Sequence, residues 1–224
     1  MSTIPRLGVS QRVEVVESYG ERRDCLDQAW TDLLEQWGYQ PVPLPNTVQN
    51  PHNYLHSMEL DGLVLSSGND LAHLDDATQP APERDAFERA ALEWAIKTEV
   101  PTIGICRGLE LLNDYFGGTL STVDDHVDTE HTISFETATQ KQTPTDKVDL
   151  PDQTRVNSYH NYGLTRDDIA DELAVVATAS DETIEAIAHT EHPLFGIMWH
   201  PERETPSTEL DRKLFDGLFA PDKQ

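Results

Sequence analysis

The sequence predicts an α/β fold in which a mostly parallel central sheet carries helices on both faces, within a single domain covering residues 1–224. Three observations predict it. Short apolar runs alternate with longer segments of helical periodicity, and no linker-like stretch interrupts them. A strand-like run at 102–105 passes through a glycine-flanked turn directly into a helical pattern. The second half is richer in strand-like runs, which predicts a small antiparallel extension there.

The elements of the first half follow from their apolar patterns. In the segment 22–37, apolar side chains recur at three- and four-residue intervals, which predicts an amphipathic helix that Gly38 ends. Cys25 lies on this apolar stripe and is expected in the core. The other expected elements are a strand at 6–10, an extended segment at 41–44, a buried strand at 61–66 and a helix at 83–98.

The second half is expected to open with the strand at 102–105 and a helix at about 107–116, which Gly117 and Gly118 stop. Four later runs are rich in β-branched or aromatic residues, and one helical pattern closes the chain. The expected strands are 133–137, 174–178, 184–189 and 194–199, and the expected helix is about 207–219.

Charge excludes several classes of function. The chain has 41 acidic and 16 basic residues and a formal net charge of −25, which repels nucleic-acid phosphates and anionic membranes. No apolar stretch approaches the length of a membrane span, and the N-terminus lacks the apolar run of a signal peptide. Two cysteines make no disulfide framework. We expect a cytoplasmic protein with no nucleic-acid or membrane partner.

The acidic residues are spread along the chain, and lysine is scarce. A uniformly acidic, lysine-poor surface suits concentrated salt, where screening removes the self-repulsion. The composition therefore favours a salt-rich cytoplasm over an ordinary acidic surface.

The turn after the strand at 102–105 carries the strongest chemical signal. Gly104 and Gly108 flank Cys106, which gives the nucleophile-elbow pattern with Cys in place of Ser. Such a turn holds the side chain up at the sheet edge and at a helix N-terminus. There we expect a lowered thiol pKa and backbone N–H groups for an oxyanion. Cys106 is therefore the candidate nucleophile.

A cysteine nucleophile needs a base and a group that orients the base. His200 and Glu202 follow the last expected strand and, two residues apart in extended chain, point to the same side. Glu202 can then accept the imidazole N–H and fix its tautomer.

Four segments together resemble the class I glutamine amidotransferase superfamily, in its γ-glutamyl-γ-aminobutyrate hydrolase (peptidase C26) family. Between them they extend the resemblance over about residues 6–205. The segments are Ser-Ser-Gly-Asn-Asp at 66–70, Gly-Ile-Cys-Arg-Gly at 104–108, Val-Asn-Ser-Tyr-His at 156–160 and Met-Trp-His-Pro-Glu at 198–202.

The resemblance implies a doubly wound, flavodoxin-like sheet and a Cys106–His200–Glu202 triad. It implies an oxyanion hole made by the backbone N–H groups of Arg107 and of the loop around Gly68. The expected reaction passes through a γ-glutamyl thioester and requires no metal or organic cofactor. One departure lies in that loop, where Ser67 replaces the usual glycine and puts the loop conformation in question.

The resemblance also implies the residues that hold the glutamyl group. The segment 158–162 is expected to present backbone groups to the α-amino and α-carboxylate ends. Glu110 replaces the glutamine of many relatives, and its carboxylate either grips the substrate's α-ammonium or faces solvent. The substrate-binding candidates are Asn69, Glu110, Ser158, Tyr159, Asn161 and Tyr162.

Three arginines bear on the identity of the leaving amine. Arg12, Arg22 and Arg23 follow the carboxyl end of the first strand, where open α/β sheets bind ligands. They either meet an anionic leaving group such as a phosphate or pair with nearby acidic residues. The segments 8–12 and 21–24 resemble a sub-branch that cleaves γ-glutamyl-CDP-amidate in surface-polysaccharide phosphoramidate synthesis.

Two other functions stay open beside a stand-alone hydrolase. We expect no fused synthase domain in these 224 residues, so the chain either hydrolyses its own γ-glutamyl amide or passes ammonia to a separate synthase partner. The Cys106-Arg107-Gly108 form of the elbow resembles the hydrolase branch. The fold also hosts non-catalytic binding or regulatory members, although all three triad residues are present here. Related proteins are often dimers, but no interface signature stands out.

A metal site is not expected from spacing. The run from Asp124 to His131 is rich in Asp, Glu and His but lacks the fixed spacing and the glycine turn of a hard-cation loop. We therefore expect an acidic surface loop there.

Overall fold

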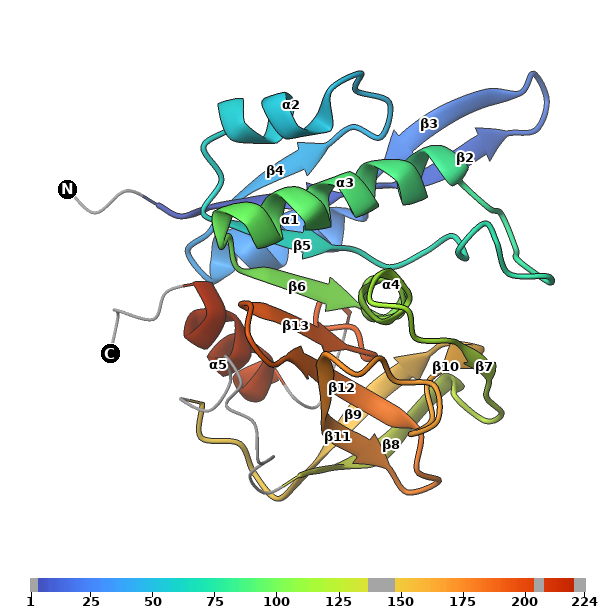
Figure 1. Cartoon of the computed structure of the whole chain (residues 1–224), viewed down its shortest axis with the longest axis vertical. Helices are drawn as coiled ribbons and strands as arrows, with labels where there is room; N and C mark the ends of the chain where they lie inside the picture. The colour runs from blue at the N-terminus through green and yellow to red at the C-terminus, as the bar shows by residue number, and fades with distance from the viewer. Residues whose placement is uncertain (1–3, 137–147, 204–207, 220–224) are drawn as a thin grey trace. The chain divides into compact units, whose positions relative to one another are not determined.

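The computed structural model of the chain (Figure 1) describes residues 4–136, 148–203 and 208–219. Its residues cluster into two compact units, 1–102 and 103–224, and each is described by itself. The single domain over 1–224 stays a prediction. No helix in the described ranges is long and apolar enough to cross a bilayer.

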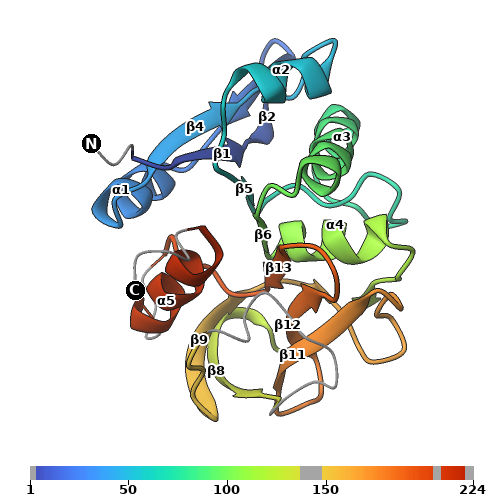
Figure 2. The same cartoon turned by 60° about the vertical axis from the view of Figure 1, so that its left-hand side comes forward.

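The first unit has a parallel sheet in the order β4-β1-β5, with helices on both faces. Figures 1 and 2 place α1 on one face and α2 and α3 on the other. The expected strands and the long helix are confirmed within one or two residues, whereas α2 was not expected. The bounds are β1 Arg6–Ser10, α1 Gln28–Gln36, β4 Gln40–Leu44, α2 Pro51–Ser57, β5 Gly62–Leu65 and α3 Pro82–Thr98.

A buried apolar cluster joins this sheet to α2 and α3. Phe87, Ala91 and Trp94 recur at helical spacing on α3 and pack with Leu55 of α2 and Leu63 of β5. Full burial of a side chain such as Leu or Phe is worth about 1.5–3 kcal/mol. The cluster therefore fixes α3 against the sheet, and α3 in turn carries a side chain of the candidate site.

The helix expected at 22–37 is wrong in its first third. Residues Glu21–Cys25 form β3, which pairs in antiparallel register with β2, Arg12–Val16. The helix begins only after Asp27, whose side chain accepts the Ala29 N–H at 3.0 Å as an N-cap. Cross-strand pairing overrides the helical spacing here. Cys25 is therefore the half-buried last residue of a hairpin strand and not a helix core residue.

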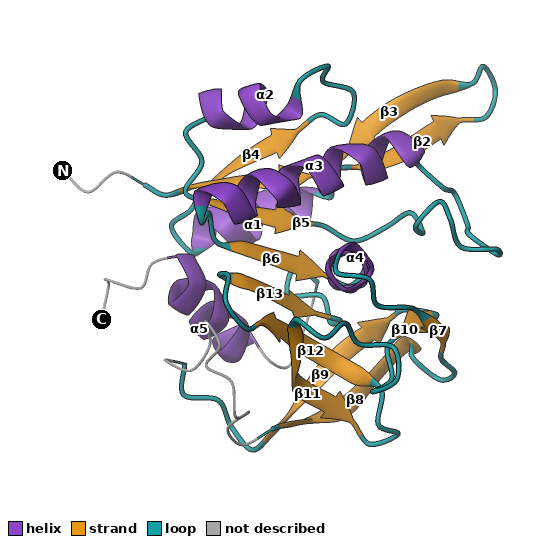
Figure 3. Ribbon diagram, viewed as in Figure 1, coloured by secondary structure: helices purple, strands orange, loops and turns teal. Residues whose placement is uncertain are grey.

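The second unit is built on an antiparallel sheet in the order β13-β12-β11-β8-β9, drawn in orange in Figure 3. Three of the expected strands of this half are confirmed within two residues, and β9 was not expected. The strand expected at 133–137 begins six residues earlier, at Val127, and its residue Thr137 lies outside the described residues. The bounds are β8 Val127–Phe135, β9 Gln153–Tyr159, β11 Leu173–Ala179, β12 Ile184–His189 and β13 Leu194–Ile197.

Four further elements carry or adjoin residues of the candidate site. β6, Thr102–Ile105, leads through Cys106 into α4, Arg107–Tyr115, as expected. A two-stranded ribbon pairs β7, Ser121–Thr122, with β10, Tyr162–Gly163.

The last helix, α5 (Thr208–Phe219), also confirms the expectation, apart from Ser207, which lies outside the described residues. The buried Trp199 donates from Nε1 to Asp211 Oδ1 of α5 at 2.7 Å. This bond anchors the helix to the segment that carries His200. Parallel strands, flanking helices and an antiparallel part confirm the predicted α/β class.

Candidate active site

Cys106 lies on a strained turn between β6 and α4. Its φ of 51° and ψ of −105° place a non-glycine residue at positive φ. A Cβ on Gly104 would lie 2.4 Å from the carbonyl carbon and oxygen of Gly108, so the close approach requires a glycine there. The Cys106 backbone N–H donates to the Ile197 carbonyl at 2.7 Å, which ties the turn to the end of β13. The local geometry is that of the nucleophile elbow.

The environment of the thiol differs from the sequence expectation. Burial raises the pKa of the Cys106 thiol well above its ordinary value, and the negative charge of Glu110 raises it further. The backbone N–H of Arg107 opposes this shift by pointing at the sulfur. Burial and Glu110 together therefore outweigh the pKa-lowering effect of the helix N-terminus. The resting side chain is a neutral thiol that a base must deprotonate.

His200 and Glu202 form a buried pair after β13. The His200 Nδ1 lies 2.8 Å from Glu202 Oε1, which is the contact that the sequence predicts. The chain there is not extended as expected, because Pro201 and Glu202 lie in a turn in which the Arg203 N–H donates to the His200 carbonyl at 3.3 Å. A carboxylate accepts, so Nδ1 carries the proton and Nε2 is left as the basic nitrogen. Among the described residues Nε2 has no hydrogen-bond partner, although it is buried. That nitrogen is free to take a proton.

Asn157 on β9 holds the backbone of His200 and was not among the predicted site residues. Its side-chain Nδ2 donates to the His200 carbonyl at 2.9 Å, and its Oδ1 accepts the His200 N–H at 2.8 Å. Both bonds are buried. Asn157 stood within one of the four motif segments, but only the register of β9 shows what its side chain does.

Tyr159 covers the imidazole. Its ring meets that of His200 edge to face, with centroids 5.5 Å apart, and the Arg203 guanidinium lies 4.2 Å above the Tyr159 ring centroid. These two contacts restrict the orientation of the Tyr159 and His200 rings.

The remaining predicted substrate residues of this unit have distinct environments. Glu110 is only 4% exposed and near enough to Cys106 to affect its pKa, so it does not face solvent. The Ser158 hydroxyl is buried and donates to the His126 carbonyl at 2.7 Å. Asn161 is exposed, and its carbonyl accepts the Val123 N–H at 2.9 Å, while the half-buried Tyr162 begins β10.

In the first unit, the loop after β5 is organised by Arg84 of α3. The Arg84 side chain is fully buried, and its Nε lies 2.9 Å from Glu88 Oε1. The guanidinium donates to the carbonyls of Ser66, Ser67 and Gly68, with a distance of 3.1 Å to Ser67. This buried cation was not anticipated, since nothing in the spacing of Arg84 marks it.

The contact between Arg84 and the Ser67 carbonyl determines the direction of the Gly68 N–H. In a trans peptide the carbonyl of Ser67 and the N–H of Gly68 point in opposite directions. Because Arg84 holds that carbonyl, the N–H turns away from Arg84, and among the described residues it has no hydrogen-bond partner. Such a donor is suited to an anionic oxygen.

Positive φ explains why Ser67 is tolerated in this loop. The left-handed conformation falls on Gly68, at 84°, and on Asn69, at 56°, and not on Ser67. At Asn69, a residue type that tolerates this conformation, the side chain is held by hydrogen bonds to two other segments. Its Oδ1 accepts the Val13 N–H at 2.8 Å, and its Nδ2 donates to the carbonyls of Val13 and Gln79 at 2.9 Å.

Each of the three candidate leaving-group arginines has an acidic neighbour. Arg12 Nε lies 3.4 Å from Glu14, and Arg22 and Arg23 each lie 2.6 Å from a carboxylate, of Glu83 and Glu21 respectively. All three are at least partly exposed. Arg12 also borders the loop after β5, because its guanidinium lies 3.4 Å from where a Cβ on Gly68 would be.

A second group of titratable side chains lies elsewhere in the second unit. We name His126, His131, His160 and Glu185 the His–Glu cluster. Contacts with Glu185 and then Asp181 raise the pKa of His126 to about 9, against the opposing effect of burial. Burial by itself raises the pKa of Glu185, but the three histidines hold it below its usual range. The sequence placed His126 and His131 on an acidic surface loop; His126 is instead buried.

Comparison with known proteins gives consistent matches. The Peptidase C26 family model matches residues 5–202. A γ-glutamyl-CDP-amidate hydrolase from Campylobacter jejuni is 29% identical over 88% of this chain and 90% of its own. A γ-glutamyl-γ-aminobutyrate hydrolase from Escherichia coli O157:H7 is 29% identical over 90% and 87%. The crystal structure of a glutamine amidotransferase from Thermotoga maritima, 16% identical, covers 94% of this chain and 81% of its own with a TM-score of 0.64, which confirms the fold.

Proposed function

Because this chain belongs to the Peptidase C26 family, we propose that it is a cysteine-dependent hydrolase of a small γ-glutamyl amide. The products are glutamate and the free amine. The observation that carries the proposal is the strained Cys106 turn in the same unit as a buried His200–Glu202 pair whose Nε2 is unoccupied by any described residue. Relatives whose names specify hydrolysis of two different γ-glutamyl amides support the same bond class.

The first half of the reaction forms a thioester. His200 Nε2 takes the proton of the Cys106 thiol, since burial keeps that thiol neutral at rest. The sulfur attacks the γ-carbonyl carbon, and the negative charge on the oxygen is stabilised by the Arg107 N–H. Gly68, whose N–H is free among the described residues, is the second donor that the sequence predicts. The imidazolium then gives its proton to the departing amine, and the C–N bond breaks.

The second half releases glutamate. His200 removes a proton from water, the hydroxide attacks the thioester carbon, and the sulfur leaves and recovers a proton from the imidazolium. Glu202 keeps the ring in one tautomer and stabilises its charged form throughout. Every proton in both halves passes through one nitrogen, and the proposed mechanism uses no metal or organic cofactor.

Glu110 is proposed to bind the α-ammonium of the glutamyl group. The support is its place: the Glu110 carboxylate is buried, lies one helical turn after Cys106, and is near enough to affect the pKa of that thiol. The other proposed glutamyl contacts are Asn69, Ser158, Tyr159, Asn161 and Tyr162. The side chains of Asn69 and Ser158 are engaged with the protein backbone, so their contribution would come from their own backbone groups.

For the leaving group we favour an amine attached to a nucleoside diphosphate over γ-aminobutyrate. The resemblance at 8–12 and 21–24 supports this, as do the relative from Campylobacter jejuni and the position of Arg12 beside Gly68. The carboxylates next to Arg12, Arg22 and Arg23 would be exchanged for phosphate oxygens on binding.

The proposed setting is a salt-rich cytoplasm, supported by the net charge of −25 and the scarcity of lysine. Assays therefore need concentrated salt. A homodimer, or a separate synthase that receives ammonia, would extend the proposal, and each has a simple readout: sedimentation for the dimer, and activation by a partner for the synthase.

The deciding experiment compares glutamate release from four substrates by purified protein in high salt, with Cys106→Ala as the control. The substrates are glutamine, γ-glutamyl-γ-aminobutyrate, another γ-glutamyl amine and γ-glutamyl-CDP-amidate. Strong release from one amide other than glutamine, absent in Cys106→Ala, supports the stand-alone hydrolase. Turnover of glutamine alone, or none until a synthase is added, would replace it with the ammonia-donating subunit.

The same assay tests the arginines. Arg12→Ala, Arg22→Ala and Arg23→Ala should each raise KM for the nucleotide amide by about tenfold, the effect of losing one charge-assisted hydrogen bond. KM for γ-glutamyl-γ-aminobutyrate should stay unchanged. Equal effects on both substrates would rule out a leaving-group role.

A further inference from the structure

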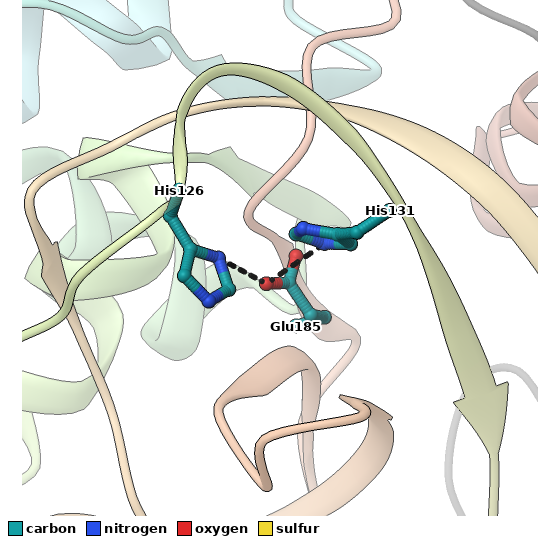
Figure 4. Close-up of side chains that lie close together, drawn as sticks. All are labelled: His126, His131 and Glu185. Atoms are coloured by element: carbon teal, nitrogen blue, oxygen red, sulfur yellow. Dashed lines mark ion pairs between the residues drawn. The ribbon is translucent and has the colours of Figure 1, made fainter.

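The second unit holds a buried carboxylate surrounded by three imidazoles from two other chain segments, residues 126–131 and residue 160. Glu185 of β12 is fully buried, and its Oε1 lies 3.3 Å from His126 Nδ1, 3.2 Å from His131 Nε2 and 3.5 Å from His160 Nε2. Figure 4 shows the rings of His126 and His131 on two sides of the carboxylate. His126 and His160 are each 3% exposed. None of these groups takes part in the proposed reaction.

These contacts are short but poorly directed. Among the described residues, none of the three ring nitrogens that face Glu185 makes a hydrogen bond of acceptable geometry, and neither does either Glu185 oxygen. Buried polar atoms are nearly always bonded, and an unpaired one costs about 1–3 kcal/mol. Five such atoms facing one another indicate a site built for a positively charged occupant.

The outward-facing nitrogens fix the protonation pattern of two rings. His160 Nδ1 lies 2.8 Å from the Tyr162 carbonyl, which can only accept, so Nδ1 carries the hydrogen. The Nε2 of a neutral His160 therefore presents a lone pair to Glu185. His126 Nε2 likewise lies 2.9 Å from the Asp181 carboxylate, so Nε2 carries a hydrogen and Nδ1 is the nitrogen that faces Glu185. A ring nitrogen can face a carboxylate at this distance only with a cation between them, either a proton or a metal ion.

Both outward contacts are those found behind metal-bound histidines. A ligating imidazole usually donates its other N–H to a carboxylate or a backbone carbonyl, which fixes the tautomer and orients the ring. His126 has the carboxylate of Asp181, and His160 has the carbonyl of Tyr162. The cluster thus has ligands and groups that orient two of them.

The three distances to Glu185 also match edges of a tetrahedral site. Ligand atoms at about 2.0–2.1 Å from zinc lie about 3.3–3.4 Å from one another in a tetrahedron. The three contacts to Glu185 Oε1, 3.2–3.5 Å, lie around that edge length. In such a site each ring nitrogen points at the metal, about 35° away from the neighbouring oxygen, which explains short contacts without hydrogen-bond geometry.

We propose that His126, His131, His160 and Glu185 bind one divalent transition-metal ion, with Zn²⁺ the best match to three imidazoles and a carboxylate. The ligand atoms of His126, His131 and Glu185 all lie within 4.8 Å of one another, so binding draws the two rings closer. Four protein ligands leave no open position, and the ion is structural.

The ion would stiffen the segment that precedes the candidate site. The carbonyl of His126 accepts from the Ser158 hydroxyl at 2.7 Å and from the His160 N–H at 3.1 Å. The carbonyl of Glu185 accepts the Met198 N–H at 2.8 Å, two residues before His200. One ion would therefore tie three chain segments to the strand that leads to the catalytic base.

The test uses tag-free Cys106→Ala protein, because the thiol is itself a strong transition-metal ligand in the second unit. The protein is stripped with a chelator, reloaded with ZnCl₂ or CoCl₂, and passed over a desalting column. We expect one Zn²⁺ per chain by mass spectrometry, the intense visible absorption of tetrahedral Co²⁺, and a rise in Tm of at least about 5 °C at saturating Zn²⁺.

Matched variants locate the ion. His131→Gln alters the only partly exposed ligand and should fold, yet it should lose the bound metal and the rise in Tm. Glu185→Gln should do the same. His56→Gln, which changes an exposed histidine of α2, should keep both. Failure of Cys106→Ala to retain Zn²⁺, or equal retention by His131→Gln, would overturn the proposal and leave protons as the occupants of the cluster.

Discussion

Asn157 holds the backbone of His200 from both sides, donating to its carbonyl at 2.9 Å and accepting its N–H at 2.8 Å. The base of the candidate triad is therefore positioned twice. Glu202 orients the ring, and Asn157 of β9 fixes the chain on which the ring stands.

Asn157→Ala should lower kcat by about 10–100-fold and change KM little, because a shift of the base of about 1 Å is enough for such a loss. It should also lower the free energy of unfolding by about 2–4 kcal/mol, since two buried backbone groups lose their partners. Steady-state kinetics and urea denaturation measure the two effects.

The matched control is Asn113→Ala. Asn113 is a buried asparagine of α4 that bonds the backbone of Thr119, Asp168 and Ala170. A similar loss of stability without the loss of kcat is expected there. If both variants lose kcat equally, Asn157 has no positioning role beyond its contribution to stability.

Removing the charge of Glu202 isolates its effect on the imidazole. Glu202→Gln should reduce kcat by about 10²–10⁴-fold with little change in KM, because the His200 tautomer is no longer fixed and the imidazolium is not stabilised. Glu209→Gln, on the exposed face of α5, should leave the kinetics unchanged. Retention of full kcat by Glu202→Gln would exclude Glu202 from the triad.

Variants of the buried pair of Arg84 and Glu88 can distinguish an effect on stability from an effect on the loop after β5. Arg84→Met alone should lower the free energy of unfolding by about 3–5 kcal/mol, because it removes the cation that lies 2.9 Å from the buried Glu88 carboxylate. The double variant Arg84→Met, Glu88→Leu should recover most of that loss in urea denaturation.

The double variant should nevertheless keep a low kcat. Without the guanidinium no described side chain holds the Ser67 carbonyl, so the Gly68 N–H, the proposed second oxyanion donor, loses its fixed direction. The kcat should then fall by about 10²–10³-fold, the usual effect of losing such a donor. A double variant that recovers both stability and kcat would show that Arg84 acts only as a core residue.

Replacing Glu110 should lower the pKa of the Cys106 thiol and raise KM. Its charge raises the pKa of the Cys106 thiol, so Glu110→Gln should lower that pKa and increase the thiolate fraction at a given pH. Alkylation by iodoacetamide, followed from pH 7 to 10 in a Cys25→Ala background, should then become faster at the low end of the range. KM for a γ-glutamyl amide should rise, because the proposed ammonium contact is lost.

The two readouts are independent. Faster alkylation with an unchanged KM would remove Glu110 from the substrate pocket but keep its electrostatic effect on the thiol. An unchanged alkylation profile would contradict the electrostatic effect itself.

The sequence by itself determined the parts of the molecule whose causes are local. The glycines at 104 and 108 allow the sharp turn at Cys106, the separation of His200 and Glu202 by two residues keeps their side chains within reach of each other, and the apolar periodicity of α3 defines its buried face. Each depends on neighbours within a few residues, so composition and spacing are enough to predict it.

Only the tertiary structure decided the rest. The hairpin of β2 and β3 replaced a helical pattern because cross-strand pairing outweighs propensity. Burial and Glu110 reversed the expected direction of the Cys106 pKa shift. The His–Glu cluster draws on residues 126, 131, 160 and 185, which no spacing relates. Desolvation and long-range contacts are properties of the packed chain, and they set the chemistry that its motifs can only suggest.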